Sequence, residues 1–360
     1  MTVSKSEAST QNRLETLDQL RGFFIVTIII DHLSRFPTFF SFLSGNALLW
    51  VTAAEGFVSI SGLLVGYVRG YKNRHLPFKD VSVKLLRRAL LLYAWSLIGT
   101  IVYVAIIWYI PLKGGAQSTT LAVGDWKNLL IELFSLRFTY VWVHFLTLYA
   151  LFLAASPIAI WLFRRGLAWV VAVTSLALLA LGWITKSEPL QWQFLFFIPS
   201  IVGFYLHSIL GWWHALKRKK QLTFAITTVA LTIMTITISV LFTYYEPIEN
   251  PFGDQFNKMF FAKDSISLLR ALTAFLWFTG YLFVFYKFRK FIKRFLNWLL
   301  IPVGTHSLTA YILHGVALCI ISFFTISGDN PWINSLLGII AVMLTWGLLK
   351  IHFVRRVVPA

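Results

Sequence analysis

Long apolar runs separated by short polar stretches make up most of the chain, and each run has about the length of a membrane-spanning helix. About 20 mostly apolar residues, rising about 1.5 Å each, cross the hydrocarbon core of a bilayer. The pattern therefore predicts an all-α, polytopic integral membrane protein with about ten transmembrane helices. The predicted spans are residues 18–40, 47–69, 85–110, 140–163, 167–185, 192–212, 222–243, 268–287, 300–326 and 333–354.

Composition agrees with a membrane protein and limits its organisation. The 360 residues are 58% hydrophobic and 13% charged, whereas soluble domains are about 25% charged. With a single cysteine, Cys319, no disulfide can form within the chain. The first 13 residues are polar and lack the order of regions that marks a signal peptide. We therefore expect a cytoplasmic tail over residues 1–16 and a single transmembrane domain over 17–355.

Charge predicts an orientation. The net charge is +18, which in a soluble protein would suggest nucleic acid as a partner. Here most of the 32 Lys and Arg residues lie in alternate loops, on one side of the predicted spans. Because cytoplasmic loops carry the excess of Lys and Arg, both termini are predicted to be cytoplasmic, and no nucleic-acid partner is expected.

The first predicted span, in LDQLRGFFIVTIIIDH, carries ionisable residues at both ends of its apolar core. On a helix, Asp18, Arg21 and His32 fall within an arc of about 60°, with His32 roughly 16 Å from Arg21 along the axis. Asp31 points about 100° away from His32. Ionisable groups inside a bilayer cost a few kcal/mol, so this stripe indicates a functional site.

The second predicted span carries Glu55 on a stripe of small residues. Ser59, Gly62, Gly66 and Arg69 share its face at helical spacing. Small residues in such a stripe are typical of close helix packing, and we expect that role for Ser59 and the two glycines. Packing does not explain a carboxylate, so Glu55 is a candidate site residue.

Two further spans carry histidines at a similar predicted depth. Tyr311 and His314 share a face of the ninth span, and His144 begins the fourth. A lone histidine in an apolar helix is often only a packing residue. His32, His144 and His314 could in principle bind zinc, but their spacing does not define such a site, and no metal is predicted. The expected pocket, in the outer half of the membrane, is formed by His32, Glu55 and His314, with Asp31, Tyr311 and His144 in support.

Arginines mark the opposite side. Arg21, Arg69, Arg87 and Arg88 are predicted to line a basic mouth that faces the cytoplasm. Guanidinium groups suit phosphate, so the last three are candidates for holding a phosphate-bearing cosubstrate. The alternative is that they only follow the charge rule for cytoplasmic loops.

Four motifs together resemble a known family. LDQLRG followed by DH is similar to the opening of the bacterial OpgC-type membrane acyltransferases, and AAEGFVSISGLLVGYVRG to their second span. VHFLTLYALFLAASPIAIWLFRRG resembles their fourth span and VGTHSLTAYILHG their ninth. The likeness runs in order from about residue 14 to about 325.

The resemblance implies a ten-helix enzyme of the bacterial inner membrane that modifies a cell-envelope glycan. It would move an acyl group, succinyl or acetyl, from cytoplasmic acyl-CoA to a hydroxyl of an extracytoplasmic glycan acceptor. Carried over by position, Arg21 and His32 form the first-span pair, Glu55 is the second-span acid, and His314 is the late histidine. Acetyl-CoA or succinyl-CoA would be the cosubstrate, and the oligomeric state is not predicted.

A mechanism follows from this set. Transfer to a sugar hydroxyl needs a base and a group that stabilises the oxyanion. We expect His32 to be the base, oriented by Glu55, with His314 or Tyr311 as the oxyanion donor. A covalent acyl-His32 relay stays open. The rival interpretation is a secondary transporter in which the intramembrane His and Glu residues form a proton relay.

Overall fold

A computed structural model describes residues 5–43, 45, 48–110, 121–244, 251–323 and 330–351. Within these ranges the chain is all-α, which confirms the predicted fold class. The elements in chain order are α1 (Lys5–Leu33), α2 (Ala53–Leu64), η1 (Val65–Lys72), α3 (Phe78–Tyr109), α4 (Trp126–Phe134), α5 (His144–Arg164), α6 (Ala168–Thr185), α7 (Glu188–Trp192), α8 (Phe194–Phe204), α9 (Leu206–Ala215), α10 (Arg218–Tyr244), α11 (Pro251–Phe260), α12 (Leu268–Lys287), α13 (Arg289–Phe295), α14 (Asn297–Thr305), α15 (Ser307–Phe323) and α16 (Pro331–Lys350).

Several of these helices can cross a membrane, and the chain is a multi-pass membrane protein. Among the described residues, α3, α5, α6, α10, α12 and α16 are long and apolar enough. Two broken pairs raise the number from six to eight if each pair is one span: α7–α8 with α9, bent by 61°, and α14 with α15. The count of ten and the cytoplasmic termini remain predictions.

Four predicted spans differ clearly from the helices found. The first ends at Leu33 rather than at residue 40, and its apolar part carries three charged residues. The second begins at Ala53 and becomes the π-helix η1 after Leu64. The sixth, predicted as one helix over 192–212, is broken after Phe204, where α9 turns away from α8 by 61°. The ninth, predicted as one helix, is two, because the chain breaks between Thr305 and Ser307. Residue 47 of the second predicted span, residues 324–326 of the ninth and residues 352–354 of the tenth lie outside the described residues.

The chain forms two compact units. The first unit comprises Met1–Thr27, Ser41–Leu76 and Ala159–Thr305, and the second comprises Ile28–Phe40, Pro77–Ile158 and His306–Ala360. Helices α1 and α5 contribute residues to both.

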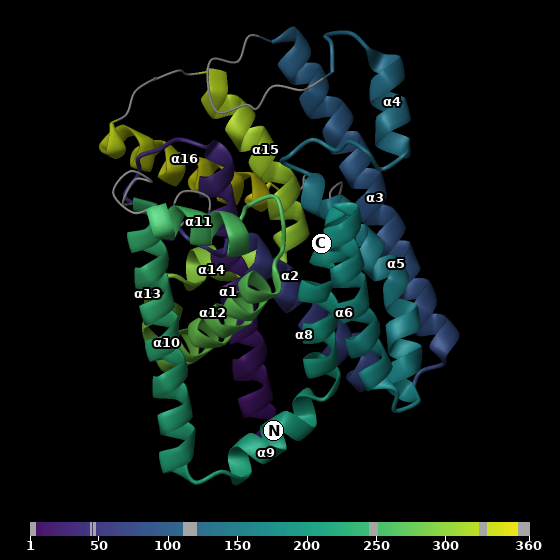
Figure 1. Cartoon of the computed structure of the whole chain (residues 1–360), viewed down its shortest axis with the longest axis vertical. Helices are drawn as coiled ribbons and strands as arrows, with labels where there is room; N and C mark the ends of the chain where they lie inside the picture. The colour runs from purple at the N-terminus through teal and green to yellow at the C-terminus, as the bar shows by residue number, and fades with distance from the viewer. Residues whose placement is uncertain are drawn as a thin grey trace. The chain divides into compact units, whose positions relative to one another are not determined.

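In the first unit, α2 and η1 pack against α8, and α10 lies along α12 (Figure 1). The predicted small-residue stripe makes the α2–α8 contact. A Cβ at Gly62 would stand 2.0 Å from the carbonyl oxygen of Phe196, and one at Gly66 would stand 1.9 Å from that of Ser200. Only glycine allows backbones to approach so closely, which confirms the packing role predicted for these two residues.

In the second unit, α15 packs against α16 and α3. The hydroxyl of Tyr103 on α3 donates to the carbonyl oxygen of Ile312 at 2.7 Å. The ring of Tyr103 also covers Gly315, where an added Cβ would come within 2.4 Å of it. These contacts fix the height and rotation of α15 beside α3.

Candidate active site

Two histidines predicted from sequence meet in the second unit. His32 lies in the last turn of α1 and His314 in the middle of α15. Their rings are in hydrogen-bond contact, with Nδ1 of His32 2.7 Å from Nε2 of His314. His314 is completely buried, whereas His32 is half-buried.

The hydrogen bonds determine where each ring carries its proton. Nδ1 of His314 bonds to the carbonyl oxygen of Tyr311, which can only accept, so this nitrogen is protonated. In the neutral ring, Nε2 of His314 then has no proton and accepts from Nδ1 of His32. The lone pair of neutral His32 is therefore on Nε2. A base with a fixed tautomer is what proton abstraction requires.

The segment after His32 is tied to the start of α16. The hydroxyl of Ser335 lies 2.9 Å from that of Thr38 and accepts from the backbone N–H of Phe39 at 2.9 Å. The side-chain amide of Asn334 donates to the carbonyl oxygen of Pro37 at 3.0 Å. These bonds hold the chain that leaves α1, and with it the last turn that carries His32.

Tyr311 and His144 lie near the histidine pair. The ring centroid of Tyr311 is 6.2 Å from that of His32 and 5.0 Å from that of His314. His144, at the start of α5, is half-buried, bonds to the hydroxyl of Thr139 at 2.8 Å, and is close enough to act electrostatically on His32. The second unit thus brings together four of the predicted site residues. Asp31 is buried in the same unit, beside His32 in sequence.

Glu55 belongs to the first unit, where it forms a buried ion pair with Arg270 of α12. Nε of Arg270 donates to Oε1 of Glu55 at 2.8 Å, and one terminal nitrogen bonds to the same oxygen. Oε2 accepts from the backbone N–H of Thr52 at 2.9 Å and from its hydroxyl, closing a capping box at the start of α2. Glu55 and Arg270 are 0% and 1% exposed. The carboxylate therefore anchors α2 to α12.

Arg270 also holds a loop. Its other terminal nitrogen donates to the carbonyl oxygens of Ala262 and Ser265, at 2.7 and 2.8 Å, and to that of Lys263 at 3.3 Å. One buried guanidinium thus joins α2, α12 and the segment that leads into α12. Sequence analysis missed this residue, although an arginine inside an apolar run is a signal that could have found it.

The remaining predicted residues are divided between the units. Asp18 and Arg21 lie in the first unit and interact electrostatically, and Arg21 lies 3.5 Å from the carbonyl oxygen of Gly304. Arg69 is half-buried in η1 of the same unit. Arg87 and Arg88 are on α3 in the second unit, the former exposed. A common mouth formed by these arginines therefore stays a prediction.

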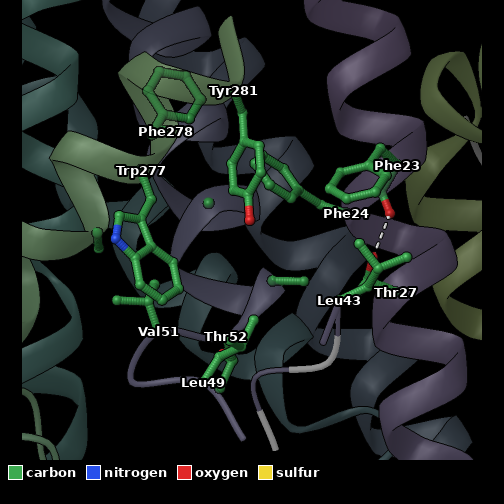
Figure 2. A pocket seen from close by; sticks show the side chains of 13 residues that line it. Phe23, Phe24, Thr27, Leu43, Leu49, Val51, Thr52, Trp277, Phe278 and Tyr281 are labelled. Atoms are coloured by element: carbon green, nitrogen blue, oxygen red, sulfur yellow. Dashed lines mark hydrogen bonds between the residues drawn. The ribbon is translucent and has the colours of Figure 1, made fainter. Parts of the chain in front are cut away.

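A small cavity in the first unit lies between α1, α2 and α12 (Figure 2). Phe23 and Phe24 face Trp277 and Tyr281 across it, and the hydroxyl of Thr27 is turned back to the carbonyl oxygen of Phe23. Its volume of about 20 Å³ holds about one water molecule. The cavity is too small for an acyl donor or a sugar.

A family model described as OpgC protein matches residues 13–355, nearly the whole chain. The chain belongs to the OpgC family. No curated protein and no solved structure matches it. Family membership confirms the resemblance seen in the four motifs and gives the class of the molecule, a multi-pass membrane acyltransferase.

In this OpgC-family chain two predicted roles need correction. The residue that hydrogen-bonds the His32 ring is His314, not Glu55, whose four hydrogen bonds go to Thr52 and Arg270. Both ring nitrogens of His314 are engaged, one by His32 and one by the Tyr311 carbonyl, so in this arrangement His314 holds the His32 ring and has no N–H left to donate to an oxyanion. Among the described residues, no group of three or more His, Cys, Asp or Glu side chains could hold a metal ion.

Proposed function

We propose that this OpgC-family protein transfers an acyl group, succinyl or acetyl, from cytoplasmic acyl-CoA to a hydroxyl group of an extracytoplasmic glycan. The observation that carries the proposal is the hydrogen-bonded His32–His314 pair, because acyl transfer to a hydroxyl needs a base whose basic nitrogen is fixed. Family membership supports the reaction class. The bacterial inner membrane is the proposed location.

The proposed step is direct transfer. Nε2 of His32 takes the proton of the acceptor hydroxyl as its oxygen attacks the thioester carbonyl. The new C–O bond forms, the C–S bond breaks, and the proton passes from His32 to the leaving thiolate. His314 stabilises the protonated His32 ring by accepting from its Nδ1–H, as the third member of a catalytic triad does.

The donor is proposed to be held by arginines through its phosphates. Arg69, Arg87 and Arg88 have the planar guanidinium groups that bind phosphate with two parallel hydrogen bonds. Arg87 is exposed on α3 and can meet a water-soluble ligand. Arg69 is half-buried, so an anionic group beside it would offset part of the cost of burying its charge.

The test uses inside-out membrane vesicles with radiolabelled succinyl-CoA or acetyl-CoA outside and the host's glycans sealed in the lumen. Label is expected on luminal glycan with the wild-type protein. His32→Ala is expected to lower the rate about 10²–10⁴-fold, the usual contribution of a general base. The matched control is His207→Ala, which removes an exposed histidine stacked on Tyr71 in the first unit and should leave the rate unchanged.

Three outcomes would contradict the proposal or one of its steps. If wild-type vesicles consume neither donor across a panel of acceptors, the proposal that the protein transfers acyl groups to glycans is wrong. If wild type and His32→Ala transfer label equally at matched protein levels, the protein is still an acyltransferase, but His32 is not its base. Label that stays on the protein and is lost with His32→Ala would favour the covalent relay.

A further inference from the structure

The first unit contains a large cavity to which the preceding sections assign no role. It measures about 970 Å³ and is lined by α9, the start of α10, the end of α12 and α13, with residues from α1 and α2 at one side. A ligand pocket of a drug-sized molecule is typically 300–1,000 Å³. The cavity is therefore large enough for an organic ligand with both a polar and an apolar part.

The polar part of the lining is basic. Arg218 begins α10, and Lys287, Arg289 and Lys290 follow one another around the junction of α12 and α13. The guanidinium of Arg289 stacks over the ring of Tyr286 at 4.8 Å, which directs it. None of the described residues that line the cavity is acidic, so its charge is suited to an anion.

The rest of the lining is apolar and rigidly built. Trp213 of α9 packs against Phe283 of α12 with ring centroids 5.7 Å apart. The side-chain amide of Gln221 donates to the carbonyl oxygens of Trp213 and Leu216, at 2.6 and 3.2 Å, which fixes the corner between α9 and α10. The other apolar side chains are Leu17, Leu63, Leu206, Leu210, Leu222, Ala225, Leu282, Phe288 and Phe291.

The helices around the cavity have the character of membrane-interface elements. Helix α9 buries none of its residues, and its Trp212 is 59% exposed. On the other side, Phe288 and Phe291 are also exposed. Aromatic side chains next to Lys and Arg are typical of the depth at which lipid head groups lie. A ligand that reaches this cavity is therefore expected to come from the bilayer.

We propose that this cavity binds an anionic glycerophospholipid. The phosphate would lie among Arg218, Arg289 and Lys290, and one acyl chain would lie along the apolar wall formed by Trp213 and Phe283. Basic pockets between membrane helices on the cytoplasmic side are suited to such head groups, because Lys and Arg attract the charged phosphate near the lipid surface. This site is independent of the proposed acyl transfer.

The test is native mass spectrometry of the full chain in detergent, with phosphatidylglycerol or phosphatidylcholine of identical acyl chains. Wild type is expected to retain one phosphatidylglycerol at concentrations where it retains no phosphatidylcholine. Arg289→Ala/Lys290→Ala should weaken phosphatidylglycerol binding at least fivefold. Lys219→Ala/Lys220→Ala removes the same charge from exposed positions outside the cavity and should change binding by less than twofold. The charge-preserving Arg289→Lys/Lys290→Arg should retain binding.

Three results would overturn the proposal. Equal binding of the two lipids would mean that the head group is not recognised. Equal losses in the two alanine pairs would mean that general surface charge attracts the lipid. If micromolar coenzyme A displaces phosphatidylglycerol, and added phosphatidylglycerol does not displace bound coenzyme A, the cavity binds a water-soluble phosphate ligand instead.

Discussion

The buried pair of Glu55 and Arg270 gives the most direct test of the structure, through a double-mutant cycle. Arg270→Met keeps a long unbranched side chain and removes the charge, and Glu55→Gln keeps the shape and the acceptor for Thr52. Because both side chains are almost completely buried, each single variant leaves a charge without its partner. Such a loss typically costs about 3–5 kcal/mol of unfolding free energy.

The double variant removes both charges at once. Its loss should be no larger than that of either single variant, because a buried ion pair replaced by neutral groups is often close to neutral for stability. The coupling energy, which is the sum of the two single losses minus the double loss, is then at least about 3 kcal/mol, or more than a hundredfold in the unfolding equilibrium. Arg270 also donates to three loop carbonyls, so Arg270→Met is expected to be the more damaging single change.

The measurement is reversible unfolding in mixed detergent micelles, followed by tryptophan fluorescence. The matched control is the exposed pair of Asp254 and Lys258 on α11, whose nitrogen and oxygen lie 2.6 Å apart. Removing its charges should change the unfolding free energy by at most about 1 kcal/mol with negligible coupling. Additive losses at Glu55 and Arg270 would refute the reasoning, since they would mean that the two side chains do not share one buried interaction.

Three further changes test the second unit. His314→Ala should lower the transfer rate at least tenfold more than it lowers the protein level. His314→Gln can still accept a hydrogen bond from His32 and should retain part of the rate. Equal transfer rates for wild type and His314→Ala would exclude a positioning role for His314. Gly315→Ala should lower the unfolding free energy by about 1–3 kcal/mol, because the new methyl group meets the ring of Tyr103. Adding Tyr103→Leu should recover part of this loss. No loss of stability with Gly315→Ala would contradict the close packing of α15 on α3. Ser335→Ala removes two hydrogen bonds to the segment after α1 and should lower the unfolding free energy, followed by thermal unfolding, by about 1–3 kcal/mol. An unchanged unfolding free energy would mean that other contacts hold this segment.

Apolar length predicted most helices well, because a membrane-spanning segment needs only a continuous run. The eighth predicted span, 268–287, coincides with α12, and the fifth differs from α6 by one residue. The ninth failed because the apolar residues on both sides of residue 306 were read as one span, although the short polar sequence Thr305-His306-Ser307 marks the place where the backbone breaks. Length alone also could not show that the second span turns into a π-helix.

The sequence selected the two histidines that meet, but it did not predict their contacts or those of Glu55. His32 and His314 were selected because ionisable residues inside apolar helices are costly, and both lie where expected relative to their own helices. Which of them meet depends on packing between helices, which is set by residues such as Gly315 and Tyr103 that carry no catalytic signal. For the same reason Glu55 was assigned to His32, while its actual partner, Arg270, was not selected.

The glycine contacts also predict how relatives of this chain can vary. At Gly62 and Gly66 an added methyl would meet backbone carbonyl oxygens of α8, which every amino acid carries, so no second substitution can make room. At Gly315 it would meet the side chain of Tyr103, which a smaller residue could replace. Sequence drift should therefore leave the first two positions as glycine, whereas a larger residue at 315 should appear together with a smaller one at 103.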